Sequence, residues 1–336
     1  MDFLADYGLY FAKTLTAVIA ILAVLLFAFA LTQKDKLKKG ELRITKLNDK
    51  FQGIAKLFKH TVLTKSEFKA WMKSEKKADK ERKKAKDTPP RIFVIHFKGD
   101  MRASQVQNLR EEITATLTIA TPRDEVVICL ESPGGMAHAY GLAASQLQRL
   151  RDHNIPLTVA VDKVAASGGY MMACVANRIL AAPFSIIGSV GVLAQIPNFH
   201  RYLKKHDIDF EQITAGEYKR TLSMFAENTK AGKQKFTEKI EALHTLFKNF
   251  VAQHRPEVDL KEIATGDAWQ GIEALDLKLV DELITSDDYL YKASQTKDLY
   301  RVEYTNKRTI GDKLSHTLQS SIKTMVDCLH EWPYLL

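Results

Sequence analysis

Two short runs of small residues could hold a nucleophile and the groups that stabilise its transition state. One is Ser132-Pro133-Gly134-Gly135 and the other is Ala165-Ala166-Ser167-Gly168-Gly169. Glycines let backbone N–H groups approach a ligand closely, and two such groups aimed at one point can bind the oxyanion of acyl transfer. A serine directly before a Gly-Gly pair and a helical stretch has its hydroxyl at a helix N-terminus, which suits a nucleophile that gains negative charge.

Each run also has a purely structural interpretation. Ser167 is explained as well by an ordinary N-cap, and Gly134 and Gly135 by a tight turn between a strand and a helix. A phosphate-binding loop is not supported, because no G-x-x-x-x-G-K-[ST] or G-x-G-x-x-G pattern is present. Neither run decides for catalysis by itself.

A serine nucleophile needs a base, which could be a histidine or a lysine. No G-x-S-x-G elbow surrounds Ser167, and His138, the His beside the first run, also fits the solvent-facing start of a helix. Lys219 follows a strand-like run over residues 210–214. An ordinary lysine amine has a pKa of about 10.4, so a lysine base requires an apolar, desolvated site. From the residues alone, Lys219 is one lysine among many.

The elements around these runs alternate between strands and helices. The pattern predicts strands over 91–97, 125–130, 156–161, 179–182 and 190–194, and helices over 105–119, 140–152 and 230–255. Such alternation indicates βαβ units around a buried, mainly parallel sheet. Ligands bind at the carboxyl ends of such strands, which is where both glycine runs lie. The sequence therefore predicts an α/β fold.

The positive charge of the chain is concentrated in one segment. Of the 49 Lys and Arg residues 19 lie in residues 33–86, against 7 of the 40 Asp and Glu residues. We expect an amphipathic helix over 41–86, whose last part from Lys73 lacks an apolar face and which Pro89-Pro90 ends. Such a segment binds nucleic-acid phosphates or anionic lipid, or is only a solvated helix. Its place after an apolar run favours lipid, and we expect no nucleic-acid partner.

Residues 9–31 are nearly all apolar and long enough to cross a bilayer as a helix. A cleaved signal peptide is the alternative, because Ala28-Phe29-Ala30 offers a small-x-small cleavage pattern. Asp2 and Asp6 before the run, its length and the lysines directly after it favour an uncleaved, single-pass anchor in the lipid bilayer.

The chain has three widely spaced cysteines, so disulfides do not organise the fold, and we expect Cys129 and Cys174 in the core.

Four segments together resemble the signal peptide peptidase A family of serine proteases. They are residues 132–135, 165–170, 187–192 and 216–219, and they occur in the order and spacing of that family. The similarity covers about residues 90–290 by motif and the anchor and lysine-rich spacer by architecture. Four ordered motifs are far more specific than any one of them.

The resemblance implies a ClpP/crotonase-like fold of stacked ββα units. It implies that Ser167 is the nucleophile, that Lys219 is the base, and that Ser189 orients the lysine amine. The oxyanion would be held by Gly134, Gly135 and Gly168. Members assemble into homo-oligomeric rings in which the Ser and the Lys can come from neighbouring protomers. No metal or other cofactor is implied.

The domains expected on this basis are an anchor over residues 1–32, a lysine-rich helical spacer over 33–90, the ClpP/crotonase-like protease domain over 91–305, and a C-terminal tail over 306–336. The expected function is that of a membrane-anchored serine endopeptidase that cleaves unfolded or membrane-derived peptides, such as signal peptide remnants. A crotonase-type acyl-CoA enzyme is one alternative, which the Ser and Lys pair and the anchor oppose. A catalytically silent, ring-forming membrane scaffold is the other.

Two features of the sequence differ from what the family resemblance implies. Relatives usually have Gly-Leu-Val-Asp where this chain has Lys278-Leu279-Val280-Asp281, so a helix end away from the dyad is expected to change. The lysines after the anchor place the catalytic domain in the cytoplasm by the positive-inside rule, whereas the family places it on the extracytoplasmic side of the bacterial inner membrane. The exported peptides that the family cleaves favour the extracytoplasmic side.

Overall fold

The computed structural model describes residues 8, 10, 11, 13–16, 18, 40–84 and 89–305. It divides into residues 42–304 and a second unit made of both chain ends. The described residues between 8 and 18 are helical, while most of the anchor predicted over 9–31 and the whole tail predicted over 306–336 lie outside the described residues. In the part of the chain that the structure describes, no helix combines the length and the apolar composition that a membrane span needs.

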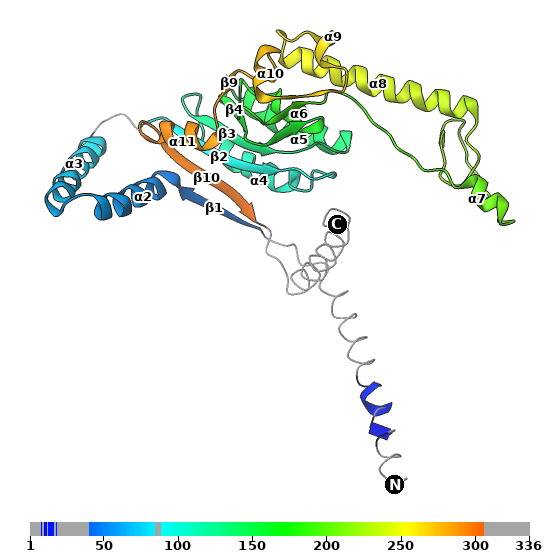
Figure 1. Cartoon of the computed structure of the whole chain (residues 1–336), viewed down its shortest axis with the longest axis horizontal. Coiled ribbons are helices and arrows are strands. Elements are labelled where there is room, and N and C mark those ends of the chain that lie inside the picture. The colour runs from blue at the N-terminus through cyan, green and yellow to red at the C-terminus, as the bar shows by residue number, and fades with distance from the viewer. Residues whose placement is uncertain are drawn as a thin grey trace, which may run out of the picture. The chain divides into compact units, whose positions relative to one another are not determined.

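The strands of the larger unit form two sheets (Figure 1). The large sheet has the order β1 (Glu41–Lys46), β10 (Asp298–Thr305), β2 (Arg91–Lys98), β3 (Glu125–Glu131), β4 (Leu157–Val161), β6 (Arg178–Ala181) and β9 (Glu282–Leu283). The small sheet has the order β5 (Val164–Ala166), β7 (Ile186–Gly188) and β8 (Ala268–Gln270). From β10 to β9 each pairing in the large sheet is parallel, whereas β8 runs antiparallel to β7. The predicted α/β class is confirmed.

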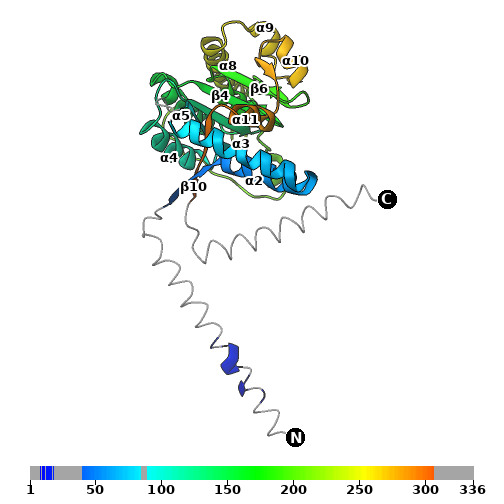
Figure 2. The same cartoon turned by 90° about the vertical axis from the view of Figure 1, so that its left-hand side faces the viewer.

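Helices cover both faces of the large sheet. The helices of residues 42–304 are α2 (Leu47–Val62), α3 (Lys65–Lys84), α4 (Val106–Leu117), α5 (Ala137–Asp152), α6 (Gly168–Ala173), α7 (His200–Lys205), α8 (Lys230–His254), α9 (Leu260–Ile263), α10 (Gly271–Asp276) and α11 (Ser286–Ser294). The larger apolar core joins the sheet to α4, α5 and α6, and a second core joins its other face to α2 and α11. Figure 2 shows α2 beside α11.

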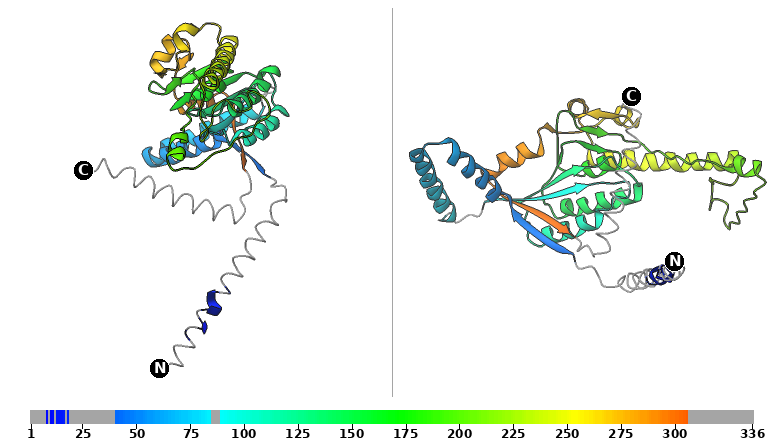
Figure 3. Two further views of the ribbon diagram at one scale, coloured as in Figure 1. Left: turned by 90° about the vertical axis from the view of Figure 1, so that its right-hand side faces the viewer. Right: turned by 60° about the horizontal axis from the view of Figure 1, so that its bottom comes forward.

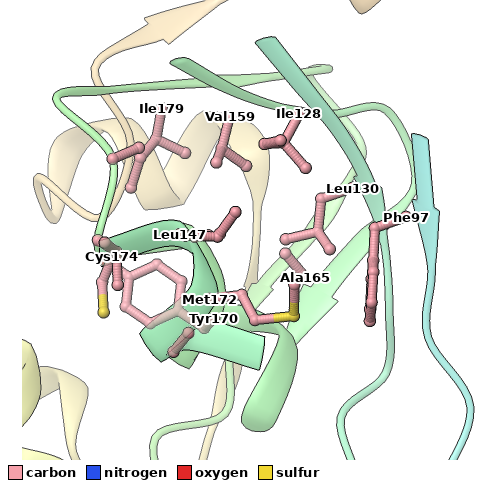
Figure 4. Packing of buried hydrophobic residues seen from close by; sticks show 14 of the residues in the cluster. Phe97, Ile128, Leu130, Leu147, Val159, Ala165, Tyr170, Met172, Cys174 and Ile179 are labelled. Carbon is pink, nitrogen blue, oxygen red and sulfur yellow. The ribbon is translucent and has the colours of Figure 1, made fainter. Parts of the chain in front are cut away.

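Strand β2 illustrates why the runs of the central strands are continuously apolar. Phe93 and Ile95 belong to the larger core, while Ile92 and Val94, which alternate with them, belong to the core on the other face. A parallel strand that is buried on both faces needs apolar residues at every position, which the alternation of side chains then divides between two cores. Figure 4 shows part of the larger core, in which Leu147 of α5 is seen between strand residues such as Val159 and Tyr170 and Met172 of α6.

The chain passes from the large sheet to the small sheet before it enters α6. Strand β4 ends at Val161 in the large sheet, β5 begins at Val164 in the small sheet, and α6 follows directly. The end of β3 makes the same step, because Ser132 forms an isolated parallel bridge with Ala165 of β5. Both glycine runs therefore leave the sheets at neighbouring points.

The predicted spacer packs partly on this domain. The side chain of Asn48, which is buried, donates to the carbonyl oxygens of Ser294 and Lys297 at 3.1 and 2.9 Å and accepts from the N–H of Leu299 at 2.7 Å. The expectation of helix from residue 41 is wrong for 41–46, which form edge strand β1 beside β10. Pairing at a sheet edge satisfies backbone groups that a short terminal segment would otherwise expose.

Two further strand expectations are wrong. Residues 190–194 are not a strand; the strand is β7, and it ends at Gly188 because Ser189 adopts a positive φ of 52° and its carbonyl accepts from the N–H of Gly191. Residues 210–214 have no regular structure.

The two described cysteines agree with the expectation of core positions. Cys174 is buried and Cys129 is largely buried, and burial raises the pKa of the Cys129 thiol to about 12.

Candidate active site

Ser167 lies between the end of β5 and the start of α6 in a conformation that few residues other than glycine adopt. Its φ is 52° and its ψ is −119°, and its backbone N–H donates to the carbonyl oxygen of Gly188 at 2.7 Å. The Ser167 side chain makes no capping hydrogen bond to α6 and is partly exposed, so the ordinary N-cap interpretation does not describe it. Residues held in such sparsely populated backbone conformations cluster at active sites.

The Gly134 backbone packs directly against the Ser167 loop. Its φ is 90°, and a Cβ atom there would lie 2.7 Å from the Ala166 carbonyl oxygen and 2.8 Å from both the Gly168 nitrogen and the Ser167 Cβ. Contacts this short exclude any side chain at Gly134. The two glycine runs, 30 residues or more apart in sequence, therefore meet beside Ser167, as expected from their places at the carboxyl ends of neighbouring strands.

The N–H groups of these glycines differ in their partners. The N–H of Gly134 donates to Ser132 Oγ at 3.1 Å, so it already has an acceptor. Among the described residues, no acceptor is found for the N–H groups of Gly135 and Gly168. These two groups are the ones that an oxyanion could use, and Gly134 contributes its close approach to Ser167.

Ser189 directly follows Gly188, whose carbonyl oxygen accepts the hydrogen bond from the Ser167 N–H. It is partly exposed, has a φ of 52°, and its N–H donates to the carbonyl oxygen of Asp267 at 2.7 Å. The aromatic ring of Trp269 covers Gly188, where a Cβ would lie 2.7 Å from the indole. Strand β8, which directly follows Asp267 and contains Trp269, was not predicted from the sequence; only the large aromatic side chain of Trp269 could have indicated it.

Lys219 lies in a segment without regular structure between α7 and α8. It is exposed, and its N–H closes a turn with the carbonyl oxygen of Gly216 at 3.1 Å. Among the described residues of this one chain, no hydrogen bond joins Lys219 to Ser167 or Ser189. Figure 3 shows α7 and the neighbouring loop at the end of α8 that lies away from the sheets.

Residues 193–225, which include α7 and the segment of Lys219, carry large apolar side chains in solvent. The exposed fraction is 79% for Leu193, 62% for Tyr202 and 95% for Ile213. Phe199, Phe210 and Phe225 are exposed as well, and the ring of Phe225 contacts those of the other two. An exposed apolar patch of this size is typical of a surface that another protein covers.

Two residues of the site were not singled out from the sequence. Ser132 and Tyr140 are buried, with 2.6 Å between their hydroxyl oxygens, and connect to the glycine runs. His138, by contrast, is exposed in the first turn of α5. The described residues include no cluster of His, Cys, Asp and Glu arranged to hold a metal ion.

The family models that match this chain both describe peptidase family S49. The model for the peptidase family S49 N-terminal region matches residues 2–147, and the model for peptidase family S49 matches residues 149–300. "Probable protease SohB" of Haemophilus influenzae is 47% identical over 95% of this chain and 94% of its own length. The protein of the same name from Buchnera aphidicola subsp. Schlechtendalia chinensis is 47% identical over 86% of this chain and 99% of its own. A solved structure of the 1510-N membrane-bound stomatin-specific protease covers 70% of this chain and 100% of its own, with 17% identity and a TM-score of 0.39.

Proposed function

The chain belongs to peptidase family S49 and is a serine-type peptidase, and we propose that it is a membrane-anchored endopeptidase with Ser167 as nucleophile and Lys219 as general base. The observation that supports Ser167 most directly is its backbone. The positive φ turns it between Gly134 and Gly188 while its side chain makes no cap to α6.

The reaction is acyl transfer. The neutral amine of Lys219 removes the proton of Ser167 Oγ, which attacks the carbonyl carbon of the substrate peptide bond. The N–H groups of Gly135 and Gly168 stabilise the oxyanion of the tetrahedral intermediate, and Gly134 permits the approach of the two loops. The protonated lysine then donates to the leaving amine, and water hydrolyses the ester at Ser167. Ser189 orients the lysine amine through its hydroxyl.

Lys219 reaches Ser167 from a neighbouring protomer in a homo-oligomeric ring. Two observations support this arrangement: Lys219 is exposed and has no hydrogen bond to Ser167 within its own chain, and its segment exposes apolar residues such as Phe210 and Ile213. Burial of that segment against a second copy would also desolvate the lysine, which a neutral amine requires.

The substrates are unfolded or membrane-derived peptides, including remnants of signal peptides. An extended peptide pairs with strand edges through its backbone and so is accepted with little regard to sequence. Residues 9–31 anchor the chain in the bacterial inner membrane by a single span, with residues 91–305 forming a ClpP/crotonase-like domain on the extracytoplasmic side. A reporter enzyme fused after Leu336 tests the side: activity in the cytoplasm would contradict it.

The test of the dyad is hydrolysis of casein by the full chain in detergent. Ser167→Ala and Lys219→Ala are each expected to abolish cleavage while the oligomer keeps its size. Ser145→Ala and Lys261→Ala, which alter an exposed serine of α5 and an exposed lysine of α9, are expected to retain it. Cleavage by Ser167→Ala at the wild-type rate would refute the nucleophile, and a wild type that neither cleaves nor reacts with a serine-directed probe would favour the silent scaffold.

A further inference from the structure

Tyr140 connects to the first glycine run through a chain of hydrogen bonds. It lies in α5, is fully buried, and its hydroxyl donates to the carbonyl oxygen of Asp100 at 2.8 Å. The same hydroxyl oxygen lies 2.6 Å from Ser132 Oγ, and Ser132 Oγ is 3.1 Å from the nitrogen of Gly134.

Only one direction is possible for the donors in this chain. A backbone N–H can only donate, so Gly134 donates to Ser132 Oγ; a carbonyl oxygen can only accept, so Tyr140 uses its one proton on Asp100. Ser132 must then donate its own proton to Tyr140. Each of the two hydroxyls therefore donates one hydrogen bond and accepts one. The backbone N–H of Gly134 is held by a buried network in which every hydroxyl has its partners.

The ring of Tyr140 also contacts the second glycine run. A Cβ atom at Gly168 would lie 2.4 Å from Tyr140 Cγ, so the Gly168 backbone rests directly on the ring. One side chain therefore touches the loop of Gly168 with its ring and holds the loop of Gly134 and Gly135 with its hydroxyl. These are the two loops whose free N–H groups face the oxyanion in the proposed function.

We propose that Tyr140 is a positioning residue for the oxyanion site. It sets the spacing between the N–H groups of Gly135 and Gly168 without touching the substrate. This inference rests on the proposed function of Ser167, Gly135 and Gly168. Misplacement of catalytic groups by a fraction of an ångström lowers the rate of the chemical step more than it lowers ground-state binding.

The test is Tyr140→Phe, which keeps the ring and removes the hydroxyl. We expect kcat on a peptide substrate to fall about tenfold or more, with KM within about twofold of wild type. The affinity for a peptidyl boronic acid, which forms a tetrahedral adduct with the serine, should fall by a similar factor. Ser132→Ala breaks the same chain at its next member, and the double variant should lose no more than the worse single variant.

Tyr170→Phe is the matched control. Tyr170 is equally buried, and its hydroxyl donates to a carbonyl oxygen, that of Leu279, at 3.0 Å, but it has no link to Gly134. We expect it to lose comparable stability and to keep wild-type kcat. The inference is overturned if Tyr140→Phe keeps its kcat, or if Tyr170→Phe loses as much.

Other outcomes are also decisive. If Tyr140→Phe does not fold, Ser132→Ala carries the same expectation of lower kcat at unchanged KM. An active Ser167→Ala would refute the proposed function itself, whereas an inactive Ser167→Ala together with a fully active Tyr140→Phe would refute the role of Tyr140 alone.

Discussion

The backbone N–H of Ser167 donates to the carbonyl oxygen of Gly188 across 2.7 Å. This bond links the start of α6 to the end of β7. Ser189, the residue after Gly188, therefore lies close to the proposed nucleophile. Both serines have a φ of 52°, which turns the chain away from β5 and β7 at the same level of the small sheet. Lys219 is the member of the proposed catalytic set that the single chain does not bring to this point.

Mixing two inactive variants should restore activity if the dyad forms between protomers. Ser167→Ala still supplies Lys219, and Lys219→Ala still supplies Ser167, so a 1:1 co-assembled ring contains intact pairs at about a quarter of its interfaces. We expect casein hydrolysis at about that fraction of wild type after co-expression, and none when the two variants are purified and assayed apart. No recovery in rings that contain both variants would place the dyad within one chain.

Gly134→Ala should remove peptidase activity and destabilise the fold. The added Cβ would meet Ala166, Ser167 and Gly168 at under 3 Å, and the φ of 90° is unfavourable for alanine. We expect kcat/KM to fall at least about a hundredfold, since the oxyanion loops are forced apart. Gly141→Ala is the control, because nothing lies within 4 Å of a Cβ there and Gly141 is inside helix α5, where alanine should add about 0.5 to 1 kcal/mol of stability. Retention of activity by Gly134→Ala would contradict the close approach.

Lys278→Gly should stabilise the protein and leave activity unchanged. Lys278 follows the end of α10 with a φ of 59°, and the N–H groups of Lys278 and Leu279 donate to the carbonyl oxygens of Leu275 and Ala274 in a Schellman motif. The left-handed conformation at this position favours glycine, which relatives usually have there. With Lys278 in its place the helix still ends at the same point, but a lysine is held in a left-handed conformation. We expect a gain of about 1 kcal/mol in the free energy of unfolding by denaturant titration. Lys278→Ala, which keeps the left-handed strain, should show no gain; a gain for alanine equal to that for glycine would refute the backbone argument.

Glu112→Gln should change how stability depends on pH. Glu112 of α4 is buried, and burial raises its pKa from 4.5 to about 7, although the N–H of Tyr304 donates to its carboxyl group. Between pH 4.5 and 7 the unfolded chain loses this proton before the folded chain does, so stability contributed by the protonated group is lost as the pH rises through that window. The loss is up to about 3 kcal/mol at 1.36 kcal/mol per pKa unit.

The neutral glutamine keeps an acceptor for Tyr304 and has no proton to lose. We therefore expect the unfolding midpoint of Glu112→Gln to exceed that of wild type at pH 8 and to differ little from it at pH 5. Thr114→Val, which alters an exposed position of the same helix, serves as the control and should follow wild type at both pH values. Equal pH dependence in wild type and Glu112→Gln would contradict a buried, raised carboxyl group.

The central strands and long helices are predictable because their patterns reflect burial. Apolar runs predict strands at 91–97 and 125–130, and the structure has them as β2 and β3, which begin at the predicted residues and are one residue longer at their C-terminal ends. Prediction failed at 41–46 and 190–194, where the local residues allow more than one conformation. There, pairing with β10 in one case and the turn at Ser189 in the other decide the outcome.

What the sequence determined by itself was the chemistry available and its order along the chain. The small residues around Ser167 and the glycine pairs before helices restrict the backbone locally, and local restrictions are visible in a sequence. Tertiary structure alone decided which of these groups meet. It brought Gly134 against Gly168, occupied the Gly134 N–H with Ser132, buried Tyr140 beneath both loops, and left Lys219 in solvent. Those outcomes depend on packing between segments far apart in the chain, where the energy of each contact is set by its partner and not by the residue alone.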